Sequence, residues 1–126
     1  MLQQTQVPRV IPKYNEFLMK FPSLEALAAA PLSDVLKAWN GLGYNRRAKY
    51  LWEVAKASDG QLGTTHEQLL GLPGVGPNTA GAILAYAYNQ PAIFIETNVR
   101  TVYLYWFFKD QTDVPDSAIR ALVEQT

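Results

Sequence analysis

The stretch Leu69-Leu70-Gly71-Leu72-Pro73-Gly74-Val75-Gly76-Pro77-Asn78-Thr79-Ala80 decides the fold of this chain. Its glycines and prolines predict two helices joined by a very short turn, because Pro77 suits the first position of a helix. Gly74 and Gly76 can both take a positive φ and let another backbone approach closely. The first amides of the second helix have no intrahelical partner and lie at the positive end of its dipole. Such a corner can hold a phosphate without a lysine.

An ordinary connection between two helices would explain the two glycines by geometry alone. The leading Leu69-x-x-Leu72, the proline at position 73 and the following Thr79-Ala80 favour DNA binding over that alternative. The residues expected to meet DNA at this hairpin are Gly74, Val75, Gly76, Asn78 and Thr79.

The rest of the chain predicts helices around the hairpin, so the fold class is all-α, in one domain over residues 1–126 with the hairpin at about 69–80. An apolar stripe at Val7, Val10, Ile11, Tyr14, Phe17, Leu18 and Phe21 predicts an amphipathic helix. Further helices are expected at 24–30, 34–39, 46–57, 66–70, 79–88, 97–108 and 116–124, with an extended run at 92–95. Ser23, Ser33 and Thr65 are the expected N-caps, and residues 1–4 read as the inside of a helix.

Composition excludes several classes of protein. Eleven basic and eleven acidic residues give a formal net charge of zero, so any binding to nucleic acid must use a local patch or backbone groups rather than bulk charge. The chain has no cysteine, hence no disulfide, cysteine zinc site or iron–sulfur cluster within these residues. The sequence shows no signal peptide and no apolar run of membrane-spanning length, and the expected location is intracellular, in the cytoplasm or nucleoid.

The hairpin resembles the helix-hairpin-helix of the endonuclease III and MutY superfamily of DNA glycosylases (HhH-GPD). That resemblance implies an endonuclease III-like helical fold and double-stranded DNA as the partner. In the family, main-chain carbonyls of the hairpin often hold a monovalent cation that also meets a DNA phosphate. The matching carbonyls here belong to Leu70, Leu72 and Val75.

Two further stretches resemble the MutY-type adenine glycosylases of this superfamily. Met1-Leu2-Gln3-Gln4-Thr5-Gln6-Val7 matches a segment that borders the base pocket; Gln4 matches the glutamine that enters the space around the extruded nucleotide, with Gln3 beside it. Asn40-Gly41-Leu42-Gly43-Tyr44 matches the turn that presents an aromatic wedge, Tyr44, to the duplex. Arg46 and Arg47 follow this turn and are expected to meet phosphates, although a solvated helix face is the plain alternative.

A third stretch, Glu96-Thr97-Asn98, matches the position of the family's catalytic aspartate at the start of a helix. The resemblance implies that Glu96 offsets positive charge on the sugar as the glycosidic bond breaks, although glutamate is one methylene longer than aspartate. Asn98 matches an asparagine that helps to place the water or the sugar. The alternative for Glu96 is a helix cap or a surface acid.

The resemblance also assigns groups that these residues lack. The family's general acid is a glutamate two residues before the Met1-Leu2-Gln3-Gln4 segment, so the chain beginning at Met1 is expected not to excise adenine at a useful rate. Asn78 stands where bifunctional members carry a lysine, which predicts hydrolysis of the base without strand cleavage. No cofactor is expected within these residues, and an iron–sulfur cluster is possible only in sequence that follows them.

The function predicted from the sequence is therefore base excision by a monofunctional glycosylase, with adenine opposite guanine or oxidised guanine as the expected substrate. Two alternatives stay open: a non-catalytic helix-hairpin-helix module that only binds DNA, and a glycosylase for mismatched thymine. A helical scaffold without a nucleic-acid role is a further possibility. The sequence leaves the oligomeric state open.

Overall fold

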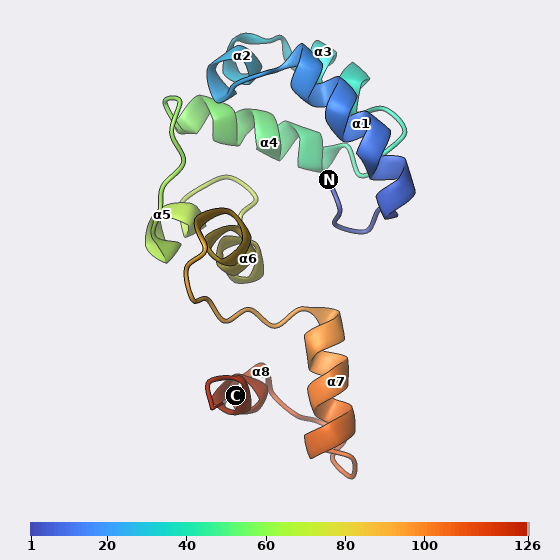
Figure 1. The fold of residues 1–126 in the computed structure, drawn as a ribbon, viewed down its shortest axis with the longest axis vertical. Coiled ribbons are helices and arrows are strands. Elements are labelled where there is room, and N and C mark those ends of the chain that lie inside the picture. The colour runs from blue at the N-terminus through green and yellow to red at the C-terminus, as the bar shows by residue number, and fades with distance from the viewer. Residues whose placement is uncertain (126) are drawn as a thin grey trace. The chain divides into compact units, whose positions relative to one another are not determined.

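The computed structural model describes residues 1–125, and every regular element in this part of the chain is an α-helix, as predicted (Figure 1). The helices are α1 (Val7–Lys20), α2 (Leu24–Ala29), α3 (Leu32–Trp39), α4 (Arg46–Ala57), α5 (His66–Leu70), α6 (Pro77–Tyr88), α7 (Thr97–Phe107) and α8 (Asp116–Val123). Within these residues no helix combines the length and hydropathy that a membrane span requires.

The chain forms two compact units. Unit 1 contains Met1–Gly63 together with Gly71–Gly74, and unit 2 contains Thr64–Leu70 together with residues 75–125. Unit 1 thus holds α1 to α4 and the first half of the hairpin turn. Unit 2 holds α5 to α8, including the helix that follows the turn.

Unit 1 is built on one apolar core to which all four of its helices contribute. Its buried side chains are Val10, Phe17, Phe21, Leu27, Val35, Trp39, Leu42, Ala48 and Ala55. Phe17 packs edge-on against Trp39, with ring centroids 6.1 Å apart. The indole N–H of Trp39 donates to the Gly43 carbonyl at 3.0 Å, so the same side chain that fills the core also fixes the turn after α3.

The apolar stripe of α1 is only partly buried. Val10, Phe17 and Phe21 enter the core as expected. The other half of the stripe, Val7, Ile11, Tyr14 and Leu18, lies exposed in this structure. The prediction of a helix over this segment is confirmed, and about half of its apolar stripe lies outside the core.

Residues 1–6 do not continue α1, contrary to the expectation that Met1–Gln4 is helical. Gln4 has φ +56°, in the left-handed region, and the segment makes a turn in which the Thr5 amide bonds to the Leu2 carbonyl at 3.3 Å. The physical reason lies in Pro8. A continuous helix would need a Pro8 N–H for the Gln4 carbonyl, and proline has none.

Two of the three expected N-caps act as caps. The Ser23 hydroxyl accepts from the Ala26 amide at 3.2 Å, and the Thr65 hydroxyl accepts from the Gln68 amide at 3.3 Å. Ser33 does not cap α3, because the helix begins at Leu32, two residues earlier than predicted: the Asp34 and Val35 amides bond to the Pro31 carbonyl, which makes Pro31 the N-cap.

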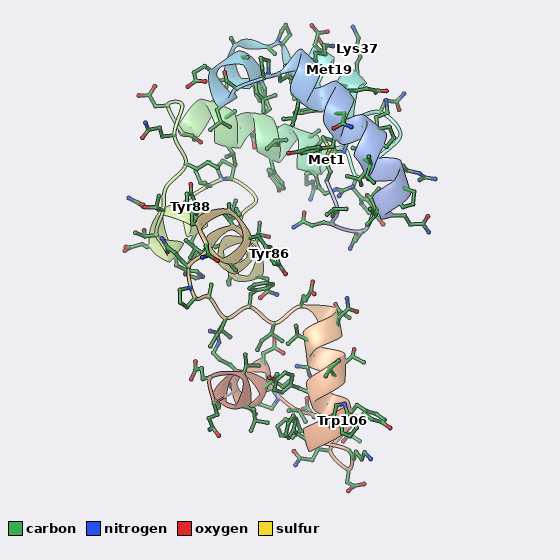
Figure 2. All side chains as sticks on the ribbon, in the orientation of Figure 1. Met1, Met19, Lys37, Tyr86, Tyr88 and Trp106 are labelled. Atoms are coloured by element: carbon green, nitrogen blue, oxygen red, sulfur yellow. The ribbon has the colours of Figure 1, made fainter. Side chains whose placement is uncertain are left out.

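Unit 2 is held together by two sets of contacts. The run before α7 packs along α6, where Phe94 lies against Gly81 and meets Tyr86, a labelled side chain of Figure 2, edge-on with centroids 5.9 Å apart. A second apolar cluster joins this run to α7 and α8 through Ile95, Val114 and Ile119. The Arg100 guanidinium pairs with Asp116 at the start of α8 and donates to the Val114 carbonyl at 2.6 Å.

Candidate nucleic-acid interface and active site

The backbone conformation and the packing of the hairpin turn both require glycine at position 74. Its φ is +71°, in the region where a side chain is strained, and a Cβ built on it would lie 2.4 Å from Cδ2 of the Tyr50 ring. The aromatic ring of α4 therefore covers the outside of the turn at the place where only glycine fits. The expected positive φ at Gly74 is confirmed.

Gly76 differs from that expectation. It is the N-cap of α6 with φ −93° and ψ 177°, an extended conformation open to any residue. A Cβ built on Gly76 would meet no atom within 4 Å, and the residue is exposed. Neither backbone strain nor internal packing accounts for glycine here. The open space over the first turn of α6 is what a phosphate needs to reach the amides of that turn.

Asn78 forms two hydrogen bonds with one residue of the run before α7. Its side-chain Nδ2 donates to the Ile95 carbonyl at 2.7 Å, and its Oδ1 accepts from the Ile95 amide at 3.2 Å. The side-chain amide thus satisfies both main-chain groups of a residue that is 7% exposed. This pairing ties the N-terminus of α6 to the residue immediately before Glu96.

Glu96 is the N-cap residue of α7, and its side chain makes no capping hydrogen bond there. Its main-chain carbonyl accepts from the Arg100 amide at 2.9 Å and so begins the helix. The carboxylate is exposed, at the positive end of α7. The Glu96 side chain therefore does not cap α7, which was one alternative to the catalytic role. Asn98, in the first turn of the same helix, is also exposed.

A cavity of about 530 Å³ opens beside the first turn of α6. Its walls are Gly76, Pro77, Asn78, Thr79, Ile95, Asp116, Ser117 and Arg120. Sequence reasoning did not single out Arg120, because its surroundings carry no recognisable motif. The available signal was the apolar pattern of α8. Ile119 is the buried residue of that helix, and its neighbour Arg120 lies at the surface.

In unit 1 the expected functional residues gather around Arg47. Its Nη1 donates to the Met1 carbonyl at 3.1 Å and also to the Gln3 carbonyl. Its Nη2 bonds to Thr5 Oγ1 at 3.0 Å and to the Leu42 carbonyl at 3.1 Å. One guanidinium therefore links the glutamine segment to the turn before α4. Sequence reasoning expected Arg47 to meet phosphates and missed this internal role.

The two residues matched to the base pocket and the wedge both have unusual backbone conformations. Gln4 has φ +56° and Tyr44 has φ +48°, values that non-glycine residues rarely adopt. Tyr44 is 64% exposed, and the Arg47 guanidinium lies 5.4 Å from its ring centroid. Gln3, Gln4 and Arg46 are exposed as well. Strained, exposed polar and aromatic groups of this kind concentrate at binding sites.

A sequence profile described as "HhH-GPD superfamily base excision DNA repair protein" matches residues 1–125. The chain belongs to the HhH-GPD superfamily of base excision DNA repair proteins. Its helical order and its tight hairpin agree with this membership, and the resemblance read from the sequence is confirmed.

Adenine DNA glycosylases are among the relatives of the chain. It is 37% identical over 111 residues to that of Buchnera aphidicola subsp. Baizongia pistaciae, covering 85% of this chain and 32% of the relative. It is 42% identical over 106 residues to that of Mycolicibacterium smegmatis, covering 81% and 36%. For the Mus musculus protein the values are 43% over 109 residues, covering 81% and 21%. The chain thus spans about a third, or less, of the length of these relatives.

Two solved structures show the same fold. A thermostable thymine-DNA glycosylase matches with a TM-score of 0.85 at 25% identity, covering 98% of this chain and 60% of that chain. Endonuclease III in a trapped covalent DNA intermediate matches with a TM-score of 0.77 at 23% identity, covering 88% and 55%. The expected endonuclease III-like fold is confirmed.

Proposed function

We propose that the protein is a monofunctional DNA glycosylase that hydrolyses the bond between the sugar and a flipped-out adenine, opposite guanine or oxidised guanine. The observation that carries this proposal is Glu96: an exposed carboxylate at the start of α7, without a capping bond, joined through Ile95 to the first turn of the hairpin helix. The names of the adenine glycosylase relatives support the choice of base.

The hairpin supplies the proposed grip on double-stranded DNA. The net charge is zero, so bulk attraction to the phosphate backbone is weak. We expect amides of the first turn of α6 to offer a phosphate directional hydrogen bonds instead, and the Thr79 hydroxyl lies in the same turn. The carbonyls of Leu70, Leu72 and Val75 are the ligand type that a hard monovalent cation takes, and such an ion would add positive charge beside the phosphate.

The chemistry requires three events at the sugar. The bond between C1′ and the base nitrogen breaks with its electron pair leaving on the base, which takes up a proton. The sugar passes through an oxocarbenium-like state, and the Glu96 carboxylate stabilises that positive charge. A water placed beside Asn98 then adds to C1′ and loses a proton, which leaves an abasic sugar and the free base. The resemblance assigns proton donation to a glutamate two residues before Met1.

Base extrusion falls to unit 1 in this proposal. Tyr44 enters the space that the base vacates, and Gln3 and Gln4 bond to base edges or to backbone around the extruded nucleotide. Arg46 meets a phosphate from the exposed start of α4. Arg47 holds the wedge and the glutamines together and adds its charge to the same surface.

Strand cleavage does not accompany base removal in this proposal. A bifunctional enzyme needs an amine to attack C1′, and Asn78 has an amide nitrogen that is not nucleophilic. The cavity beside α6 offers no lysine among its lining residues. The product is therefore an intact strand with an abasic site. An enzyme that acts on genomic DNA works inside the cell, which is where we place it.

The test is a panel of duplexes that contain A opposite G, A opposite 8-oxoguanine, T opposite G, or no mismatch. The protein is assayed with the printed sequence and in a form that carries a glutamate two residues before Met1. We expect adenine release by the longer form, alkali-dependent strand breaks, and no adduct after borohydride reduction. Thymine release would favour the thymine glycosylase, to which the 25% identical structure points.

The hairpin has its own control in the same panel. Gly76→Arg fills the open space over α6 and should abolish binding to every duplex, whereas Gln111→Arg adds the same charge to an exposed loop and should not. If the longer form binds DNA through the hairpin and releases no base from any duplex, the protein is a binding module, and the proposed enzyme is wrong.

A further inference from the structure

We infer that Asn78 is a positioning residue for the Glu96 carboxylate, so that the side chain in place of the lyase lysine orients the catalytic carboxylate instead of attacking the sugar. This inference rests on the proposed function, because it explains how the carboxylate of that site is held. Its geometric part, a side-chain amide paired with the main chain of Ile95, stands independently.

Asn78 holds the main chain directly before Glu96. As the N-cap of α7, Glu96 follows a run, 89–95, that has no regular secondary structure and therefore no ladder of backbone hydrogen bonds. The Ile95 amide and carbonyl both bond to Asn78. The main chain directly before the carboxylate residue is thus fixed on the first turn of α6, two residues from Gly76.

The pairing with the Ile95 main chain restricts which side chain can stand at position 78. The pairing needs one donor and one acceptor on the same planar group, about as far apart as the N–H and C=O of one residue. Asparagine and glutamine alone among the standard side chains carry both on an amide. A lysine at position 78 could donate to the Ile95 carbonyl and could not accept from its amide. Substituting it would leave a buried N–H unpaired.

Apolar side chains pack around the Asn78–Ile95 pair. Ile95 is buried in the cluster with Val114 and Ile119, and Phe94 packs against Gly81, where a Cβ would lie 2.9 Å from Phe94 Cβ. Apolar contacts thus set the depth of the run on α6 and α8. Because interiors are close-packed, these contacts also restrict the rotation of the run about the chain axis. The two Asn78 bonds add directional contacts at the residue next to Glu96, and we expect them to restrict further where the Glu96 side chain points.

The inference predicts a rate effect without a matching loss of DNA affinity. Asn78→Ala should lower the single-turnover rate of base release by about 10- to 100-fold, the scale of a misplaced catalytic group, and leave the dissociation constant of the duplex near the wild-type value. Asn15→Ala, on the exposed face of α1, is the matched control and should change neither.

Amide hydrogen exchange tests the pair directly and needs no activity. In Asn78→Ala the Ile95 amide should exchange faster, whereas the Arg100 amide, bonded to the Glu96 carbonyl, should stay protected. Asn78→Asp keeps the acceptor for the Ile95 amide and loses the donor. We therefore expect slow exchange at the Ile95 amide in Asn78→Asp together with a lowered rate of base release. This variant replaces Asn78→Ala as the test if Asn78→Ala does not fold.

The outcomes separate the two claims. Wild-type exchange at Ile95 in Asn78→Ala, or a wild-type rate of base release in a variant that has lost the protection, overturns the inference. If the form that carries the upstream glutamate, with Asn78 unchanged, releases no base, that result contradicts the proposed function instead, and the exchange at Ile95 still decides whether the pair exists.

Discussion

Gly74 and Gly76 stand two residues apart in one hairpin, and the structure gives them different tasks. Gly74 combines φ +71° with a ring of Tyr50 where its Cβ would be. Gly76 is extended, and open space surrounds the position of its Cβ. A constraint from inside the protein therefore acts on Gly74. At Gly76 the N-cap preference for glycine over alanine is the one internal reason for glycine, and the space over the first turn of α6 stays open.

Replacing these glycines with alanine should separate the two constraints. Gly74→Ala should lower the free energy of unfolding by about 2 kcal/mol or more, because the side chain is strained at positive φ and overlaps the Tyr50 ring. Gly76→Ala, the control, should change it by no more than about 1 kcal/mol, the usual difference between the two residues at an N-cap. Urea denaturation measures both. Equal stabilities of the two variants would contradict the assignment.

Arg47 connects elements rather than single residues. It lies on α4, bonds to carbonyls of Met1 and Gln3 on one side, and bonds to the Leu42 carbonyl on the other. Its guanidinium also lies 5.5 Å from the ring centroid of Trp39. A planar group with five donors can serve both segments at once, which the single ammonium of a lysine cannot do.

Arg47→Lys should therefore release residues 1–5 while α4 stays folded. We expect a loss of about 2 kcal/mol in the free energy of unfolding, the scale of hydrogen bonds to a charged group, and faster proteolysis before α1. Arg46→Lys, at the exposed neighbouring position, is the control and should leave both unchanged. A proteolysis pattern identical to that of the wild-type protein would show that Arg47 does not hold the segment.

The sequence predicted the elements well where the signal is local. The bounds of α4 and α5 agree with the prediction, and α6 and α7 differ by one or two residues at an end. Pro77 starts α6 because its missing N–H costs nothing there. The errors arise where neighbouring residues compete: Pro31 takes the cap of α3 from Ser33, and Pro8 disfavours a helix running on from residues 1–4, where Gln4 is left-handed.

The roles of the predicted site residues stay predictions, and the structure shows where those residues lie. Glu96, Gly76 and Tyr44 are exposed, as a binding site requires. The bonds of Asn78 to Ile95 and of Arg47 to Met1 join residues 17 and 46 positions apart, and no local pattern encodes such pairs. A side chain read as a DNA contact thus turns out to be bonded within its own unit.

At the scale of the whole molecule, the two units carry different parts of the proposed reaction. Unit 1 holds the wedge and the glutamines around Arg47. Unit 2 holds the open end of α6, the cavity beside it and the Glu96 carboxylate. In the proposed function, base extrusion and sugar chemistry are thus assigned to separate units, so a variant in either one should affect its own step. Substitutions in unit 2 that spare the hairpin should change the rate of base release more than the affinity for DNA.

Glu96→Gln tests the central claim most directly, since it removes the charge and keeps the shape of the side chain. Single-turnover release of adenine is measured in the form that carries the upstream glutamate, with Glu124→Gln as a surface control. We expect Glu96→Gln to lower the rate by about 100-fold or more at unchanged DNA affinity, because the oxocarbenium-like charge loses its partner. A Glu96→Gln protein that releases adenine at the wild-type rate would contradict the account.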